Sequence, residues 1–163
     1  MPNYENTLLD QTCKAAELAE PRFNLVVDRL AAAGHDPPAE ELVVSHGDFS
    51  PRNLLQADAG LVLIDFDRVQ HASPWRDVGY WTAWLWATAV LGGESPARGW
   101  ALGETFVAAY RATTGRRPDP RQLAWHQAAA LVRIAHGWSA LRGDAAGRDR
   151  MLDGAHALLA RAS

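Results

Sequence analysis

The chain has 163 residues, which suits one domain with its own buried core. Its net charge of -3 gives no reason to expect nucleic acid as a partner, and its single cysteine, Cys13, excludes a disulfide within the chain. No apolar run reaches the roughly 20 residues that a membrane-spanning helix needs, and no basic stretch followed by an apolar run begins the sequence. We therefore expect a soluble, cytoplasmic protein that has no membrane or nucleic-acid partner.

Apolar residues at helical spacing mark the first part of the chain. They recur from Leu8 to Ala19, and again after Pro21, which is well placed in the first turn of a second helix. The Pro37-Pro38 pair ends this pattern, because neither proline can continue a helix. The apolar stripe of the second helix consists of Phe23, Val26, Val27 and Leu30.

The centre of the chain changes to a pattern of strands and loops. The short apolar run Leu42-Val43-Val44 predicts a strand, and residues 46–53, which include a glycine and a proline, predict a loop. Two further apolar runs, at 54–55 and 61–64, flank a segment with a glycine near its end. This arrangement predicts a β-hairpin.

The remainder of the chain is predicted to be helical, over residues 77–91, 97–113, 120–141 and 145–162. The first of these segments is apolar on nearly all sides, which is typical of a buried helix. We expect the other helices to pack around its Trp81–Leu91 part. The predicted fold class is therefore α+β and mainly helical, with a short β-hairpin, in a single unit over residues 1–163.

His46, Asp48 and Asn53 form the most informative group in the sequence. The aspartate follows the histidine by two positions, and four residues separate it from the asparagine. This is the spacing of the protein-kinase catalytic loop, in which the aspartate receives or orients the proton of the attacking hydroxyl and the asparagine binds Mg²⁺.

A second acidic group, Asp65 and Asp67, lies at the end of the predicted hairpin. Asp65 is followed by Phe66, as in the Asp-Phe pair of the metal-binding segment of protein kinases. Carboxylate and amide oxygens are hard ligands that suit the magnesium ions of a phosphoryl transfer. Because the hairpin fixes the distance along the chain, we expect Asp65 to lie in one cleft with Asp48.

These motifs, with the segment from Pro74 to Gly79 downstream, resemble the aminoglycoside phosphotransferase and choline-kinase-like family. In that family a glycine, here Gly47, stands where protein kinases have arginine in the catalytic loop. The resemblance is specific over residues 43–79. It implies the C-terminal lobe of a protein-kinase-like fold, Mg²⁺ with ATP or GTP as cofactors, and a small-molecule alcohol as the phosphoryl acceptor.

Carried over position by position, the resemblance implies that Asp48 is the catalytic base and that Asn53 and Asp65 hold magnesium. His46 would be structural and brace the loop. Asp77 would cap its own helix and hydrogen-bond the catalytic loop.

Two neighbouring residues each have two interpretations. Asp67 is either a second metal ligand or an exposed carboxylate. Arg52 either contacts a phosphate oxygen or is a solvated loop arginine.

The marks of a nucleotide-covering lobe are absent from these 163 residues. There is no glycine-rich loop, and the only lysine, Lys14, lies in a predicted helix rather than on a strand. We therefore expect only the C-terminal lobe. It would be a fragment of a longer enzyme, a shortened reading frame, or part of an assembly in which a second chain supplies the other lobe or the chain forms a homodimer.

Two other functions compete with a small-molecule O-phosphotransferase. A kinase-like lobe can be a non-catalytic module for a ligand or partner chain, which an exposed apolar patch in place of the missing lobe would favour. Asp65 and Asp67 also resemble the Asp-x-Asp pair of a phosphatase, but Val69 stands where that class has threonine, and too few strands are predicted for its doubly wound sheet. Taken singly, Asp48 would be a turn residue and Asn53 a helix cap.

Charge is unevenly distributed along the chain. Residues 1–97 contain 14 acidic and 6 basic side chains, a balance of -8, whereas residues 98–163 contain 5 acidic and 10 basic side chains, a balance of +5. In the family that the chain resembles, the helices of this second segment form most of the acceptor site. We therefore expect a neutral or anionic alcohol rather than a polycationic aminoglycoside, with Asp144, Asp149 and Asp153 as the residues available for a local acidic patch.

The missing nucleotide-covering marks predict slow phosphoryl transfer by this chain alone. Purified chain mixed with MgATP and a panel of alcohols is expected to release ADP slowly or not at all, because half of the nucleotide site is absent. Rapid ATP-dependent phosphorylation would contradict this expectation.

Overall fold

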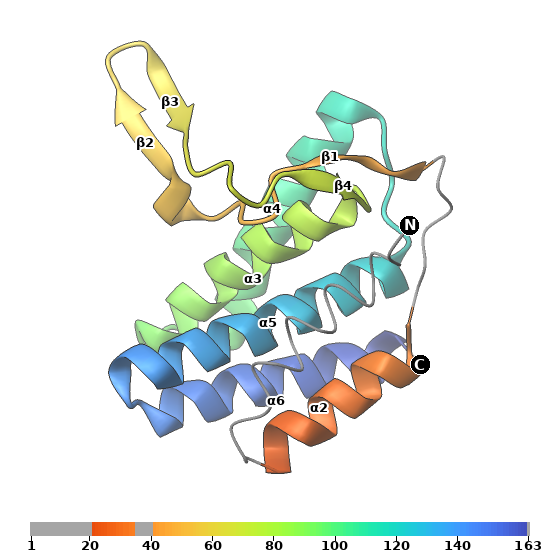
Figure 1. The fold of residues 1–163 in the computed structure, drawn as a ribbon, viewed down its shortest axis with the longest axis vertical. Coiled ribbons are helices and arrows are strands. Elements are labelled where there is room, and N and C mark those ends of the chain that lie inside the picture. The colour runs from red at the N-terminus through yellow and green to blue at the C-terminus, as the bar shows by residue number, and fades with distance from the viewer. Residues whose placement is uncertain (1–20, 35–40, 163) are drawn as a thin grey trace.

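The computed structural model describes residues 21–34 and 41–162, which form a helical body with two small two-stranded sheets above it (Figure 1). The predicted helix over Leu8–Ala19, with Cys13 and Lys14, and the Pro37-Pro38 pair lie outside the described residues. In chain order the elements are α2 (Pro21–Ala32), β1 (Val43–Ser45), the 3₁₀ turn η2 (Pro51–Asn53), β2 (Leu54–Ala57), β3 (Gly60–Leu63), β4 (Gln70–Ala72), α3 (Trp75–Leu91), α4 (Pro96–Thr114), α5 (Pro120–Arg142) and α6 (Ala145–Ala162).

The predicted α+β, mainly helical fold class is confirmed, and each predicted helix within the described residues is present within two residues of its expected ends. β4 was not predicted, since Gln70-His71-Ala72 has neither an apolar run nor a clear alternation. It is a strand because it pairs antiparallel with β1, with Val44 opposite His71. The two sheets are antiparallel pairs, so the described residues contain no doubly wound sheet of the Asp-x-Asp phosphatase kind.

The core lies where α5 is packed between α3 and α6. α4 covers the other side of α3, so part of the expected packing around Trp81–Leu91 is confirmed. α2 instead lies against α5 and α6, where the indole of Trp125 donates a hydrogen bond of 2.9 Å to the Leu30 carbonyl. No helix in the described part of the chain has the length and apolar character needed to cross a membrane.

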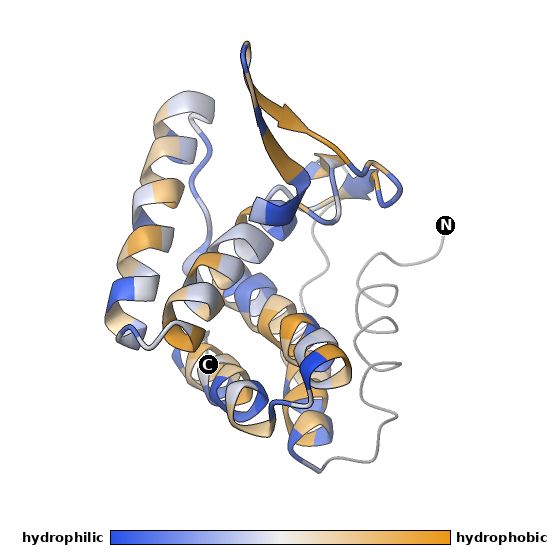
Figure 2. Ribbon diagram, turned by 90° about the vertical axis from the view of Figure 1, so that its left-hand side faces the viewer, coloured by the Kyte–Doolittle hydropathy of each residue, from blue (hydrophilic) through white to orange (hydrophobic). Residues whose placement is uncertain are grey.

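The β2–β3 hairpin projects from the helical body, and its strands are largely hydrophobic (Figure 2). Leu55 is 50% exposed and Leu61 68% exposed, which is unusual for leucines in a strand. Phe66, just beyond β3, is 57% exposed. These side chains form an apolar surface that the described residues leave open.

α3 and α5 approach each other closely at Gly79. A Cβ atom at this position would lie 2.7 Å from the Cβ of His126 and 3.0 Å from its carbonyl carbon. Both obstacles belong to the main part of α5 rather than to a flexible side-chain end. The helix crossing therefore requires a residue without a side chain at this point.

We predict that Gly79→Ala destabilises the fold by about 1–3 kcal/mol, because the new methyl group forces α3 and α5 apart. Gly137→Ala is the matched control, since Gly137 is also inside a helix but has no atom within 4 Å of an added Cβ. It is expected to be neutral or to stabilise by up to about 1 kcal/mol. Urea denaturation measures both, and equal effects of the two changes would contradict the packing interpretation.

Candidate active site

Asp77 fastens residues 46–53, the predicted catalytic loop, to the start of α3. Its Oδ2 atom accepts the backbone N–H of His46 at 2.6 Å, and its Oδ1 atom accepts that of Gly47 at 2.9 Å. Hydrogen bonds to a carboxylate are among the stronger ones in proteins. The prediction that Asp77 also caps α3 is wrong, since the N-cap residue is Pro74, without a side-chain cap bond, and Asp77 lies inside the first turn and bonds the loop.

His46 joins the loop to the segment after β3. Its Nδ1 accepts the backbone N–H of Asp48 at 3.3 Å, so the ring proton is on Nε2, which donates to the Ile64 carbonyl at 2.9 Å. The ring also packs against Phe66, with 5.0 Å between centroids. The histidine is buried and placed as the predicted brace between the two candidate motifs.

The close approach of the loop to the segment after β3 also requires a glycine at position 47. Its φ of +80° lies in the left-handed region, and a Cβ there would be 2.3 Å from the Arg68 carbonyl oxygen. A larger residue would separate the loop from the segment that carries Asp65 and Asp67. The glycine that distinguishes this motif from the protein-kinase arginine therefore has a steric cause in this chain.

The register of the hairpin brings Asn53 close to Asp65. Leu54 pairs with Leu63, and one step further the Ile64 N–H donates to the Asn53 carbonyl at 3.0 Å. Asp65 follows directly, with a φ of +65° that few non-glycine residues adopt. The hairpin thus fixes the spacing of the two motifs, as the sequence predicted.

The side chain of Asn53 reaches back to Asp48. Its Nδ2 donates to the Asp48 carbonyl at 2.8 Å and lies 3.4 Å from the Asp48 Oδ2 atom. Because the nitrogen makes these bonds, the Oδ1 atom of Asn53 takes no part in them and is the atom suited to a metal ion. Asn53 is buried, whereas Asp65 is exposed.

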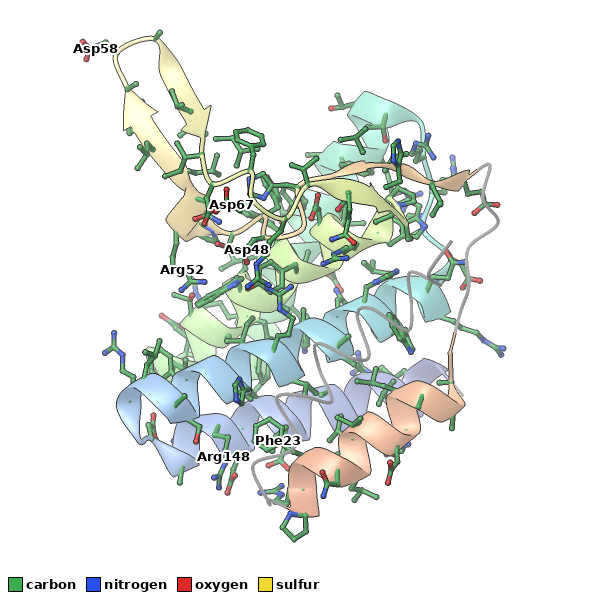
Figure 3. The ribbon with its side chains drawn as sticks, in the orientation of Figure 1. Phe23, Asp48, Arg52, Asp58, Asp67 and Arg148 are labelled. Atoms are coloured by element: carbon green, nitrogen blue, oxygen red, sulfur yellow. The ribbon has the colours of Figure 1, made fainter. Side chains whose placement is uncertain are left out.

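Asp67 and Arg52 also lie at the foot of the hairpin, near Asp48, whereas Asp58 is at its tip (Figure 3). Asp67 is exposed, which fits either of its two interpretations. Arg52 is exposed as well, but its guanidinium carbon lies 4.6 Å from the centre of the Trp84 ring. It is therefore a stacked arginine rather than a freely solvated one.

The oxygen donors of the residues at the foot of the hairpin are of the kind that magnesium prefers. Asn53 offers an amide oxygen and Asp65 and Asp67 offer carboxylates, all of them hard ligands. Within the described residues no three His, Cys, Asp or Glu side chains form a ready cluster for a metal. The donors thus suit an ion that keeps waters and phosphate oxygens as its other ligands, as Mg²⁺ does.

Arg133 of α5 is a further residue at the site, and the sequence motifs did not identify it. Its NH2 group lies 3.3 Å from Asp48 Oδ1 and 3.4 Å from the Tyr80 hydroxyl, and its NH1 group lies 3.4 Å from the Gly47 carbonyl. Its guanidinium also covers the Tyr80 ring at 4.5 Å. The available signal was a lone arginine in the apolar stretch Ala128–Ala135, where a buried charge needs a partner.

Burial changes the proton affinity of both groups beside Asp48. It lowers the pKa of Arg133, an effect that the neighbouring Tyr80 and Asp48 oppose. It raises the pKa of Tyr80, against the influence of Arg133. Tyr80 therefore stays protonated at neutral pH, and Arg133 stays charged because a guanidinium is not deprotonated in proteins.

Aromatic side chains surround the residue that follows Asp48. Phe49 stacks on Trp81 with 4.9 Å between centroids, and Phe106 of α4 is 5.4 Å from Trp81. A cavity of about 460 Å³ opens beside this group, between β1, the segment after β3 and α4. Its aromatic walls are Phe49, Phe66, Phe106 and Tyr110.

A helical lobe in which a loop and a hairpin bring Asp48, Asn53 and Asp65 together has the architecture of the kinase-like phosphotransferases. The model of the phosphotransferase enzyme family matches residues 3–126, which is most of the chain. The chain therefore belongs to this family, that of aminoglycoside phosphotransferases and choline-kinase-like enzymes. No curated protein matches the chain. Arg133 lies beyond the matched residues.

We predict that Asp77→Asn destabilises the fold by about 1–3 kcal/mol, because the amide has one oxygen for two backbone N–H groups. Asp28→Asn, on the exposed side of α2, is the matched control and should change stability by less than about 0.5 kcal/mol. Hydrogen exchange at residues 46–48 should become faster only in Asp77→Asn. An unchanged exchange rate there would show that the loop does not depend on Asp77.

Proposed function

We propose that the chain is the catalytic lobe of an ATP-dependent O-phosphotransferase, which transfers the γ-phosphoryl group of ATP, or of GTP, to a hydroxyl of a small molecule. The observation that carries this proposal is the juxtaposition of Asp48, Asn53 and Asp65 at the foot of one hairpin. The family match supports phosphoryl transfer in general. The nucleotide donor favours the cytoplasm as the place of action.

Each residue would have a separate task in this reaction. Asp48 would receive or orient the proton of the acceptor hydroxyl, as the aspartate at this position of the kinase catalytic loop does. Asn53 and Asp65 would hold Mg²⁺, with Asp67 as a possible additional ligand. The magnesium ion would supply charge neutralisation for the transferred phosphoryl group.

The acceptor is proposed to be an alcohol other than an aminoglycoside. Polycationic substrates need acidic walls, yet residues 98–163 have a balance of +5. The three acidic residues expected to be available are engaged elsewhere. Asp144 accepts bonds from Trp138 and Gly147, and both Asp149 and Asp153 pair with Arg22.

A second candidate function is a partner-binding lobe, alone or with a catalytic role. The observation that favours it is the apolar surface of the hairpin and of the segment after it, where Leu61 and Phe66 are more than half exposed. Large exposed apolar surfaces often mark an interface. The partner would be a second chain, or another copy of this one, that covers the nucleotide.

Titration calorimetry with MgATP tests the first proposal. Micromolar binding of MgATP by the native chain that is lost in Asp65→Ala, which removes a metal ligand, would support the proposal and mean that something substitutes for the missing lobe. Asp58→Ala is the matched control, since this carboxylate lies on the same hairpin but at its tip (Figure 3), and it should leave binding unchanged.

Absence of MgATP binding by the native chain would contradict a working nucleotide site in it and favour the partner-binding lobe. Binding that survives in Asp65→Ala would contradict the assignment of the metal ligand. Either result is separable from misfolding by circular dichroism of the same samples.

A further inference from the structure

The charge next to Asp48 is supplied by arginines. Arg133 pairs with its carboxylate, and the positive charges of Arg68 and Arg76 are close enough to affect Arg133. Arg52 lies on Trp84 at the same foot of the hairpin (Figure 3). The helices α3 and α5 offer the guanidinium groups of Arg76 and Arg133 and the phenol of Tyr80 beside Gly47. The Asp77 carboxylate of α3 also faces the loop, but two backbone N–H groups of the loop already engage it.

The bonds of Arg133 are long for a charged pair. Charge-assisted N–H···O bonds are usually about 2.7–2.9 Å, whereas all three polar contacts of this guanidinium are 3.3–3.4 Å. These contacts also leave its Nε atom unused. An incoming anion with better geometry can therefore replace a weak contact without leaving the charge unpaired.

Burial makes such an anion favourable. The side chains of Arg133 and Asp48 are only 14% and 16% exposed, so the pair lies in a poorly solvated place that still opens at the surface. A buried guanidinium gains more from a negative partner than an exposed one does, because water no longer screens the pair.

The acidic groups of α6 do not reach this place. Asp149 and Asp153 both pair with Arg22 of α2, and Asp149 also pairs with Arg148. Arg148 lies at the other side of the helical body from Asp48 (Figure 3). The Gly147 N–H and the Trp138 indole hold the pKa of Asp144 below its ordinary value, which shows that this carboxylate is already engaged.

We propose that Arg133 recognises a negatively charged group, a carboxylate or a phosphate, on the alcohol whose hydroxyl is presented to Asp48. This inference rests on the proposed function and narrows its acceptor from alcohols in general to anionic ones. Arg133 is a specificity-determining residue in this assignment. A planar guanidinium suits it, since it binds carboxylate and phosphate through two parallel hydrogen bonds.

Three small alcohols that differ mainly in charge test the proposal: glycerate, glycerol and serinol, which are negative, neutral and positive. Binding to the native chain is measured by two-dimensional NMR titration, with and without MgADP. Glycerate is expected to bind best, and Arg133→Gln should reduce the preference for glycerate over glycerol about tenfold or more. Arg116→Gln, an exposed arginine in the connection between α4 and α5, is the matched control and should have no effect.

Arg133→Lys is the second variant for this test and replaces Arg133→Gln if that variant does not fold. It keeps the charge but loses the planar fork, so it should reduce the preference for glycerate over glycerol severalfold. Glycerate binding that is no better than serinol binding, or that is insensitive to both variants, would overturn the inference. Failure of all three alcohols to bind would overturn it too.

Nucleotide titrations distinguish a failure of this inference from a failure of the proposed function. They also show whether the anion that Arg133 binds is the γ-phosphate of the nucleotide rather than a group on the acceptor. If glycerate binds through Arg133 but MgATP does not bind, the anion site stands and the phosphotransferase proposal fails. If phosphoryl transfer proceeds equally to glycerate, glycerol and serinol, the phosphotransferase proposal stands and the anion site fails. If Arg133→Gln weakens ATP binding but not ADP binding, the anion is the γ-phosphate of the nucleotide and the acceptor proposal is wrong.

Discussion

The carboxylate of Asp77 is the connection on which the candidate site depends. It takes two adjacent backbone N–H groups, of His46 and Gly47, that the sharp turn of the loop leaves without partners in a strand or helix. Since α3 is packed between α4 and α5, the core of the molecule determines the position of the loop. The ring of His46 then holds the segment after β3 against the loop through its hydrogen bond to the Ile64 carbonyl.

Arg133 adds a second anchor from the opposite direction. Asp77 holds the backbone of the loop from α3, whereas Arg133 holds its carboxylate from α5. The position of Asp48 is therefore set by two helices that are packed against each other at Gly79. A shift of one helix relative to the other would move the carboxylate relative to its own backbone, which explains why a contact as close as that at Gly79 is useful near a site.

Much of the fold could be predicted because it rests on local signals. Apolar periodicity identified the helices, and the glycine turn identified the hairpin, with the loop motif at its start. β4 and Arg133 could not be predicted in the same way. β4 is a strand only through its partner β1, and Arg133 belongs to the site only because α5 folds back over the loop. Both depend on contacts between distant parts of the chain, and spacing along the sequence carries no information about them.

The hairpin register divides the candidate site into a part on the β2–β3 ribbon and a part that is fixed to the helices. Asn53 and the residue before Asp65 are paired at the foot of a ribbon that projects from the body, whereas Asp48 is fixed to the helices. Because the ribbon is one paired unit, a tilt would move the two proposed metal ligands, Asn53 and Asp65, together without a change in their mutual spacing. Two side chains link the parts, since the amide of Asn53 bonds the Asp48 carbonyl and the ring of His46 bonds the Ile64 carbonyl. In the proposed reaction these links would set the gap between the phosphate and the acceptor hydroxyl, and a partner that rests on the exposed leucines of the ribbon would act on that gap.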